Sequence, residues 1–148
     1  MPIPTVDEAT GNLPPGIHQA TWEELERAFG STSHRKALLE GLLRALSTLR
    51  QAGCRRAYID GSFVTAKEVP GDFDACWDLE GVDPDLLEPT LLDFTNRRAA
   101  QKTRYGGELF IATDAAGPAG IRFLEFFQRD KRTGDPKGIV ALDLGGLP

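Results

Sequence analysis

This sequence of 148 residues is poor in cysteine, in long apolar runs and in positive charge. Its two cysteines, Cys54 and Cys76, cannot form the disulfide framework of a small secreted protein, and neither has a nearby His or Cys partner for a zinc site. No apolar run approaches the roughly 20 residues that span a membrane, and the N-terminus lacks the regions of a signal peptide. These absences predict a cytoplasmic protein with reduced cysteines and no membrane contact.

The acidic balance of the chain bears on its partners. The net charge is -5 and the pI is about 5.0, whereas proteins that grip duplex DNA usually present a basic face. Duplex DNA is therefore an unlikely ligand, but a nucleotide is not excluded, because a bound metal ion can supply the local positive charge. The hydrophobic content of 41% and charged content of 26% are those of an ordinary globular domain.

The chain divides into a short arm and one domain. Residues 1–20 contain four prolines, which predicts an extended arm, and residues 21–148 fit a single domain. Thr21 to Glu24 form a capping box that opens a helix ending near Phe29. Apolar residues from Leu38 to Leu49 recur at helical spacing and predict a second helix that Gly53 stops. Its leucine side is either core or an interface with a partner.

The rest of the domain alternates strands and helices. Strands are predicted at 55–60, 72–79, 108–113 and 139–144, and a helix at 83–103, with Pro89 as a possible break. The pattern leaves residues 121–128 undecided between strand and helix. The order of these elements predicts an α+β fold with a small mixed β-sheet and helices packed on it.

Two aspartates suggest a metal site. Asp72 and Asp74 are two residues apart on a predicted strand, so both carboxylates project from one face. Two like charges this close repel each other, and a Mg²⁺ or Mn²⁺ ion removes that penalty because hard cations bind carboxylate oxygen. Paired metal ions of this kind can clamp the attacking and leaving oxygens of a phosphoryl displacement.

A glycine-serine pair precedes these aspartates by ten residues. Gly61 permits a tight turn at the end of the strand 55–60, and Ser62 can cap the helical turn that follows. Free amides at such a turn face an anion. A strand ending in Gly-Ser, a short turn and a strand carrying Asp-x-Asp would place a triphosphate beside a metal ion.

At these residues the sequence resembles the nucleotidyltransferase superfamily, which has the polymerase-beta-like fold. The superfamily pattern is an apolar strand, Gly-Ser or Gly-Gly, about ten residues, and then Asp-x-Asp between apolar residues. Here it runs from Tyr58 to Thr65 and from Gly71 to Trp77. The resemblance covers residues 55–113, and the short chain is similar to the minimal nucleotidyltransferases, several of which are antitoxin partners of HEPN-domain toxins.

The resemblance implies a set of roles. Gly61 and Ser62 would hold the phosphates of ATP or another nucleoside triphosphate, with Lys67 in reach of them. Asp72 and Asp74 would bind Mg²⁺ or Mn²⁺, and Glu108 is the best match for the third carboxylate of active members. A nucleoside monophosphate would pass to a hydroxyl acceptor, for which a protein side chain, a tRNA end and a small molecule are all open.

Two other interpretations stay open. The superfamily's third carboxylate lies between apolar strand residues, whereas Glu108 follows Gly106 and Gly107. If Glu108 does not supply this third carboxylate, the chain would be a catalytically weak or inactive member that acts as an antitoxin-like or regulatory binding partner of another protein. It could also be an α+β protein in which the Asp-x-Asp sequence is accidental. Asp60 is interpreted as structural in each case.

Overall fold

A computed structural model describes residues 3–148 and contains one five-stranded mixed sheet. The strand order is β1-β5-β2-β3-β4, with β1 parallel to β5, β2 antiparallel to both β5 and β3, and β4 parallel to β3. The strands are β1 (Gly16–Ala20), β2 (Arg56–Asp60), β3 (Phe73–Trp77), β4 (Gly107–Ile111) and β5 (Gly138–Asp143). The predicted α+β class, a small mixed sheet with helices packed on it, is confirmed.

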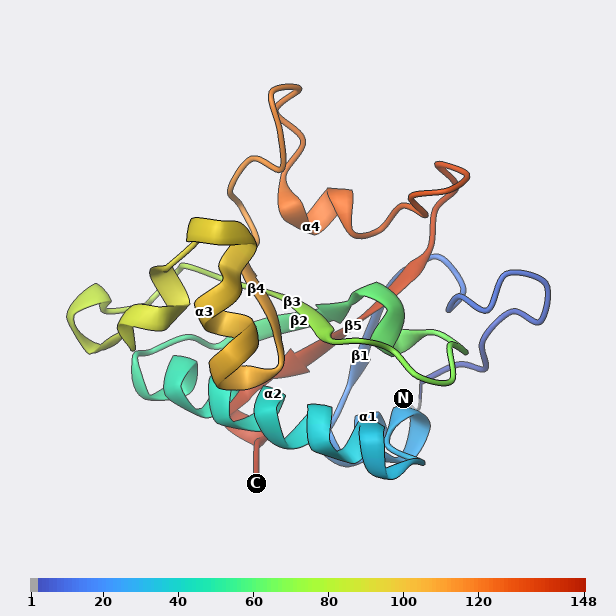
Figure 1. Cartoon of the computed structure of the whole chain (residues 1–148), viewed down its shortest axis with the longest axis horizontal. Coiled ribbons are helices and arrows are strands. Elements are labelled where there is room, and N and C mark those ends of the chain that lie inside the picture. The colour runs from blue at the N-terminus through green and yellow to red at the C-terminus, as the bar shows by residue number, and fades with distance from the viewer. Residues whose placement is uncertain (1–2) are drawn as a thin grey trace.

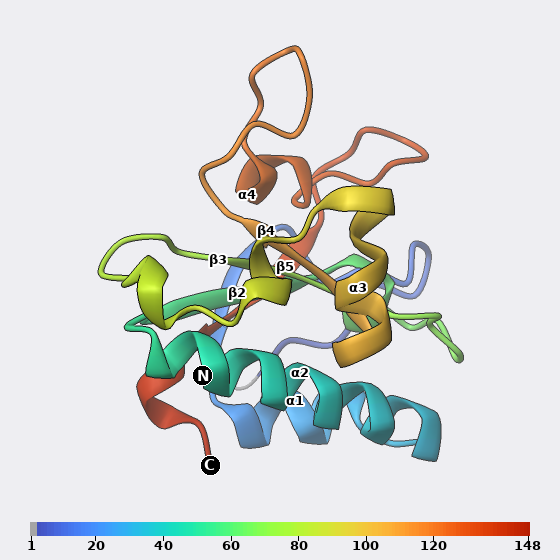
Figure 2. The same ribbon diagram turned by 60° about the vertical axis from the view of Figure 1, so that its left-hand side comes forward.

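Helices cover both faces of this sheet unequally. The longer helices α1 (Trp22–Phe29) and α2 (Ser33–Gln51) lie on one side, and the single turn α4 (Phe123–Phe126) lies on the other (Figures 1 and 2). The helix side carries the main core, which includes Ile59, Ala75 and Leu109 from three adjacent strands. A smaller apolar cluster on the other side joins Tyr58, Cys76 and Phe110 to α4.

The two N-terminal helices form as the sequence predicts. Thr21 Oγ1 accepts a hydrogen bond from Glu24 N, and Thr21 N donates to the Glu24 carboxylate, so the capping box is complete. In α2 the apolar stripe is buried against the sheet, including Leu42, Leu46 and Leu49 at 0% exposure. The stripe is therefore core, and it leaves no leucine surface for a partner.

The N-terminal arm contains a strand that the sequence does not reveal. Residues Gly16–Ala20 form β1 and pair in register with β5, from Gly16 opposite Gly138 to Ala20 opposite Leu142. The expectation of an arm without secondary structure is wrong for these residues. The reason is that the pairing partner lies more than a hundred residues away, so no local pattern marks it.

The predicted helix 83–103 is also corrected. The segment is divided into the 3-10 turns η2 (Pro84–Leu86) and η3 (Pro89–Leu92) and the helix α3 (Thr95–Tyr105). Pro89 lies inside the predicted helix and prevents a continuous one because it lacks an amide hydrogen, whereas Pro84 lies in a first turn, where a proline is tolerated. Strand β5 begins one residue before the prediction, and the undecided segment 121–128 contains α4.

Helix α3 covers the open edge of β4. Gln101, which is fully buried, accepts a hydrogen bond from Leu109 N at 2.8 Å, and Arg98 Nε donates to Leu109 O at 3.2 Å. These side chains satisfy the main-chain groups that an edge strand would otherwise expose. The edge strand that carries Glu108 is thus fixed in place.

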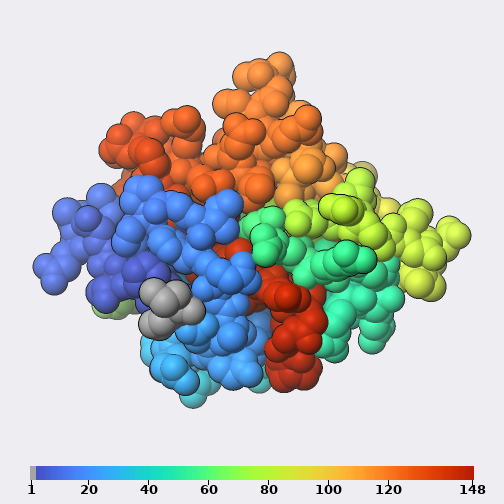
Figure 3. Space-filling model, turned by 180° about the vertical axis from the view of Figure 1, so that it is seen from behind, coloured from blue at the N-terminus to red at the C-terminus, as the bar shows by residue number. Residues whose placement is uncertain are grey.

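The surface view from behind shows segments from early and late in the sequence side by side. Figure 3 shows the N-terminal residues, in blue, packed beside the C-terminal end, in red. Above them, two projections from the orange and red-orange segments are separated by a notch.

Within residues 3–148, no helix is both long and apolar enough to cross a membrane.

Candidate functional site

Three acidic residues from three adjacent strands lie in one row across the sheet. Asp74 on β3 is paired with Asp60 on β2 and with Glu108 on β4. Residues that pair directly project from the same face of a sheet, so these three carboxylates share the face that α4 covers. We call Asp60, Asp74 and Glu108 the acidic row. Phe73, Ala75 and Trp77 of β3 alternate with Asp74 and lie in the main core on the opposite face.

Gly61 is required by the position of Asp74. It follows β2 directly, in the left-handed region with φ of +72°, and opens the 3-10 turn η1 (Gly61–Val64). A Cβ atom at this position would lie 2.1 Å from Asp74 Oδ2. The carboxylate therefore lies directly against the backbone of the Gly-Ser turn, and only glycine permits both the turn and this approach.

The loop after the Gly-Ser turn is held by a buried arginine. Arg35 of α2 is 5% exposed, and its guanidinium donates to Phe63 O at 2.7 Å, to Thr65 O at 3.1 Å and also to Lys67 O. The guanidinium also lies 5.1 Å from the centre of the Phe63 ring. Three of the four hydrogen bonds of this guanidinium go to residues 63–67, and the fourth goes to Phe29 O at 3.2 Å. Arg35 therefore ties the chain from Phe63 to Lys67 to the end of α1.

The environment of Asp74 disfavours its charged form. Burial, followed by the charges of Asp72 and Glu108, raises the pKa of Asp74 from its ordinary value of 3.8 to about 7. Lys131 and Lys137 act in the opposite direction. A carboxyl group with such a pKa exchanges its proton near neutral pH, which is typical of functional sites.

Asp60 is the most deeply buried member of the acidic row. It is 0% exposed, its Oδ2 accepts a hydrogen bond from Cys76 Sγ at 3.5 Å, and within residues 3–148 its Oδ1 has no partner. Burial and the charge of Asp74 raise the pKa of Asp60 well above its ordinary value. The position of Asp60 beside Asp74 was not expected, because nothing in the sequence of β2 indicates which residue of β3 it pairs with.

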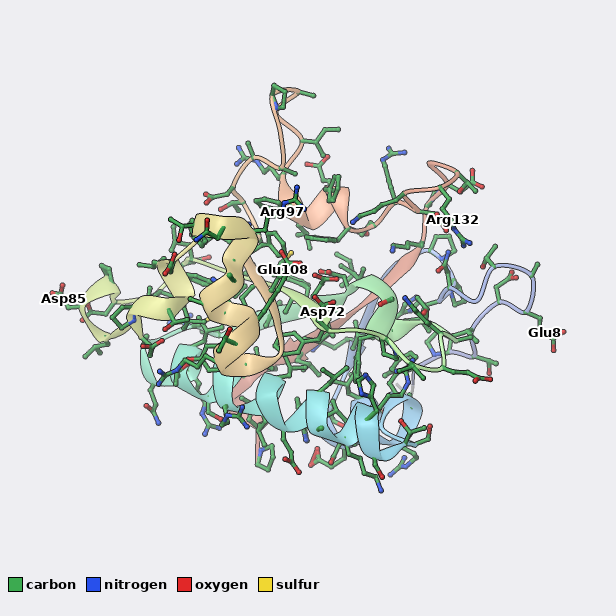
Figure 4. All side chains as sticks on the ribbon, in the orientation of Figure 1. Glu8, Asp72, Asp85, Arg97, Glu108 and Arg132 are labelled. Carbon is green, nitrogen blue, oxygen red and sulfur yellow. The ribbon has the colours of Figure 1, made fainter. Side chains whose placement is uncertain are left out.

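Asp72 and Glu108 lie beside Asp74 without completing a metal cage. Figure 4 shows both side chains in the middle of the molecule, and the charge of each reaches Asp74. Glu108 is ion-paired with Lys102 at 3.6 Å. In the part of the chain that the structure describes, no three His, Cys, Asp or Glu side chains are grouped to hold a metal ion.

The donor set nevertheless fits one kind of metal ion. Mg²⁺ is usually bound by one or two carboxylates, with waters and substrate phosphates as the remaining ligands. Asp72 and Asp74 supply two hard oxygen ligands. Burial is the first cause of the raised pKa of Asp74, and the charges of Asp72 and Glu108, which follow it, are the part that a cation would relieve. The site suits a metal that arrives with a phosphate ligand better than a permanently bound ion.

A cleft of about 640 Å³ opens over Asp74. Gly61, Ser62 and Lys67, three residues singled out in the sequence, line it together with Asp74, whereas Asp72 and Glu108 do not. The cleft is lined further by residues 10–12 and by Phe126 and Phe127. Its volume lies within the range of pockets for small molecules and cofactors.

Sequence reasoning missed one side of this cleft. Its lining includes four cations that follow α4, which we call the basic wall: Arg129, Lys131, Arg132 and Lys137. In the sequence these residues form a charged, turn-rich segment of the kind usually found in solvent. The run of four cations in nine residues of an acidic protein was the available signal. That these cations line the same cleft as Asp74 depends on the sheet topology, which no local pattern gives.

Comparison with known proteins gives a family without an assigned activity. The sequence profile of a family described as "Family of unknown function (DUF6932)" matches residues 4–143 of the chain. No curated protein and no solved structure matches it.

Proposed function

The chain belongs to the DUF6932 family, whose function is unknown, and from the site itself we propose a metal-dependent nucleotidyltransferase with a polymerase-beta-like arrangement. The observation that carries this proposal is the contact between Asp74 and the backbone of Gly61, in a cleft that four cations also line. Carboxylate, phosphate-binding turn and cations are the groups that nucleotidyl transfer needs in one place.

Each of these groups has a role in the proposed reaction. The amides of Gly61 and Ser62 and the ammonium of Lys67 bind the phosphates of ATP or another nucleoside triphosphate. The acceptor's hydroxyl oxygen attacks the α-phosphorus, and the bond from that phosphorus to the bridging oxygen of pyrophosphate breaks. Pyrophosphate leaves with the electron pair, and the hydroxyl proton passes to a carboxylate of the acidic row.

Asp72 and Asp74 would hold the metal ion in this proposal. A bound Mg²⁺ or Mn²⁺ supplies charge stabilisation for the phosphates. Glu108, next to Asp74 in the row, is the group that accepts the proton once it is released from Lys102. Asp60 is too buried to touch substrate, and it holds the base of the row through its contact with Cys76.

Calorimetry with Mg²⁺-ATP tests the proposal. The wild type is compared with Asp74→Asn, with the double variant Asp72→Asn/Asp74→Asn and with Asp85→Asn. Asp85 is exposed and lies far from Asp72 in Figure 4, so it is a control for the same chemical change. The affinity should fall at least tenfold, about 1.4 kcal/mol, in both site variants and stay unchanged in the control. Equal affinity in all four proteins contradicts the proposal.

A second candidate is a nucleotide-binding protein that does not transfer. Two observations favour it: Glu108 is ion-paired with Lys102, and within residues 3–148 no three acidic, His or Cys side chains are grouped so that they could hold a metal ion. Such a protein would bind Mg²⁺-ATP and act on a partner, as in the antitoxin-like role. Its surface for that partner is not the leucine side of α2, which is buried.

Pyrophosphate release separates the two candidates. Wild type and Lys102→Met are incubated with ATP, Mg²⁺ and a mixture of acceptors, and pyrophosphate is measured. Release by the wild type that depends on Asp74 supports transfer. Binding of Mg²⁺-ATP without release, in the wild type and in Lys102→Met, supports the binding protein.

A further inference from the structure

The basic wall is a local exception to the charge of the molecule. The chain has 17 basic and 22 acidic residues, whereas the segment from Arg129 to Lys137 has four basic residues and two acidic ones. All four cations line the cleft that contains Asp74. A short basic segment beside a cleft in an acidic protein indicates a local anion-binding surface.

Of the two acidic residues of the segment, only Asp130 forms an ion pair with a cation of the wall, which is Arg132. Asp130 is buried, and its carboxylate accepts hydrogen bonds from Asn12 Nδ2 at 2.9 Å and Arg132 N at 2.8 Å. These hydrogen bonds, with the Asn12 bond first, lower the pKa of Asp130 to about 2. Asp135 is exposed at the turn and has no ion pair within residues 3–148.

Three cations of the wall are left for a ligand. Arg132 lies 3.5 Å from Asp130, but across the described residues 3–148 no carboxylate lies within 4.0 Å of Arg129, Lys131 or Lys137. The charges of Lys131 and Lys137 nevertheless offset a small part of the rise in the pKa of Asp60 and Asp74, so they act on the acidic row. The charges of the wall therefore act on the acidic row, but within the described residues these three cations form no ion pair with its carboxylates.

An aromatic ring lies in the same part of the cleft. Phe126 of α4 lines the cleft and is 37% exposed, although it is a large apolar side chain. Its ring meets Phe127 edge to face, with centres 5.2 Å apart, and Phe127 is buried against the sheet. Phe126 is thus held firmly from behind while it remains open to the cleft, as a stacking surface requires.

Cations that follow a backbone and an exposed ring that stacks a base are the two features that bind single-stranded nucleic acid. Resting on the function proposed above, we propose that the acceptor is the end of a single-stranded nucleic acid, held by the basic wall and Phe126. The nucleotide then occupies the side of Gly61, Ser62 and Lys67, which comes from a different loop. The terminal hydroxyl of the strand is the oxygen that attacks the α-phosphorus, with pyrophosphate leaving as described.

Binding of a labelled single-stranded RNA of about ten nucleotides, measured by fluorescence anisotropy in EDTA without nucleotide, tests this acceptor site. The variants are Lys131→Gln/Lys137→Gln and Phe126→Ala, and Lys36→Gln, an exposed residue of α2, is the matched control. The double variant should raise Kd at least tenfold and reduce the slope of log Kd against log salt by about 1.4. Phe126→Ala should raise Kd about tenfold.

The outcomes separate this proposal from the proposed function. Absence of strand binding by the wild type overturns the acceptor site, and the proposed function still stands if Mg²⁺-ATP binding depends on Asp74. Equal Kd values in all variants also overturn it. Displacement of the strand by inorganic triphosphate without metal would assign the wall to the phosphates of the nucleotide and overturn it too. Strand binding without any Mg²⁺-ATP binding removes the acceptor role, because no donor is then bound.

Discussion

The carboxyl group of Asp74 makes the stability of the metal-free protein depend on pH. Its pKa is about 7 in the folded chain against an ordinary 3.8, because burial and the charges of Asp72 and Glu108 disfavour ionisation. Between these two values the folded state binds more protons than the unfolded state, so the free energy of unfolding falls as pH rises from about 4 to 7 and then levels off. Asp74→Asn removes this contribution.

Asp74→Asn should therefore be more stable than wild type at pH 8, by on the order of 2 kcal/mol, and should lose most of this advantage at pH 4. Urea denaturation in EDTA at both pH values measures it. Asp85→Asn, an exposed substitution of the same kind, should follow the wild type. An advantage for Asp74→Asn that is equal at pH 4 and pH 8 would show that the carboxyl is not titrating as described.

A double-mutant cycle tests the contact between Gly61 and Asp74. Gly61→Ala places a methyl group 2.1 Å from the present position of Asp74 Oδ2 and in a backbone conformation with φ of +72°. We expect a loss of about 2–4 kcal/mol in the free energy of unfolding, from the clash and the backbone strain together. In an Asp74→Ala background the clashes with Oδ2 and Cγ are absent and only a tight contact of 3.0 Å with the Cβ atom of residue 74 remains, so the loss should shrink to about 1–2 kcal/mol. Additive effects would mean that the two residues do not touch.

The site residues that could be predicted are those marked by a pattern in their own neighbouring residues. Gly61, Ser62, Asp72 and Asp74 were identified because a strand end and an alternating strand leave marks within a few residues. Asp60 was set aside as structural, although it pairs with Asp74, because alternation within one strand does not give the register between two. Register depends on the whole sheet, and the sequence alone does not state it.

Among the elements, helix α2 does more than cover the sheet, because its Arg35 holds the loop from Phe63 to Lys67. Arg35→Met keeps most of the side-chain volume but leaves buried carbonyl groups without donors, which should cost about 2–4 kcal/mol. Arg35→Lys should recover part of this loss, because an ammonium group cannot reach all of these carbonyls in one plane. Urea denaturation measures both, with Lys36→Gln as control. Wild-type stability of Arg35→Met would show that the loop does not depend on this residue.

Elements with their own local signals were predicted, and those defined by distant partners were not. Helices α1 and α2 and strands β2, β3 and β4 carry caps, periodicity or alternation in their own residues. Strand β1 has only its pairing with β5, and α4 is a single turn that packs through Phe127 and Phe123. The expected helix 83–103 failed where Pro89 outweighed its apolar spacing.

For the whole molecule, the sheet order could not be read from the chain order. The last strand, β5, lies between β1 and β2, so the two ends of the sequence join to complete the sheet. The same arrangement brings Asn12 from the N-terminal segment to Asp130 of the segment that carries the basic wall. One side of the cleft therefore depends on residues from both ends of the sequence, which explains why local patterns missed it.

Removal of residues 1–20 tests whether this segment is an appendage or part of the domain. The deletion takes away β1, which pairs with β5 over five residues, and the buried Leu13. Because β5 would then present an unpaired edge of a largely buried strand, the truncated chain should aggregate or lose cooperative unfolding. Asn12→Ala in the full chain removes only the side-chain hydrogen bond to Asp130 and should lower the free energy of unfolding by about 1 kcal/mol. Size-exclusion chromatography and thermal unfolding by circular dichroism distinguish these results. A truncated chain that stays monomeric and unfolds like the full protein would show that residues 21–148 fold without β1 and that β1 adds nothing to their stability.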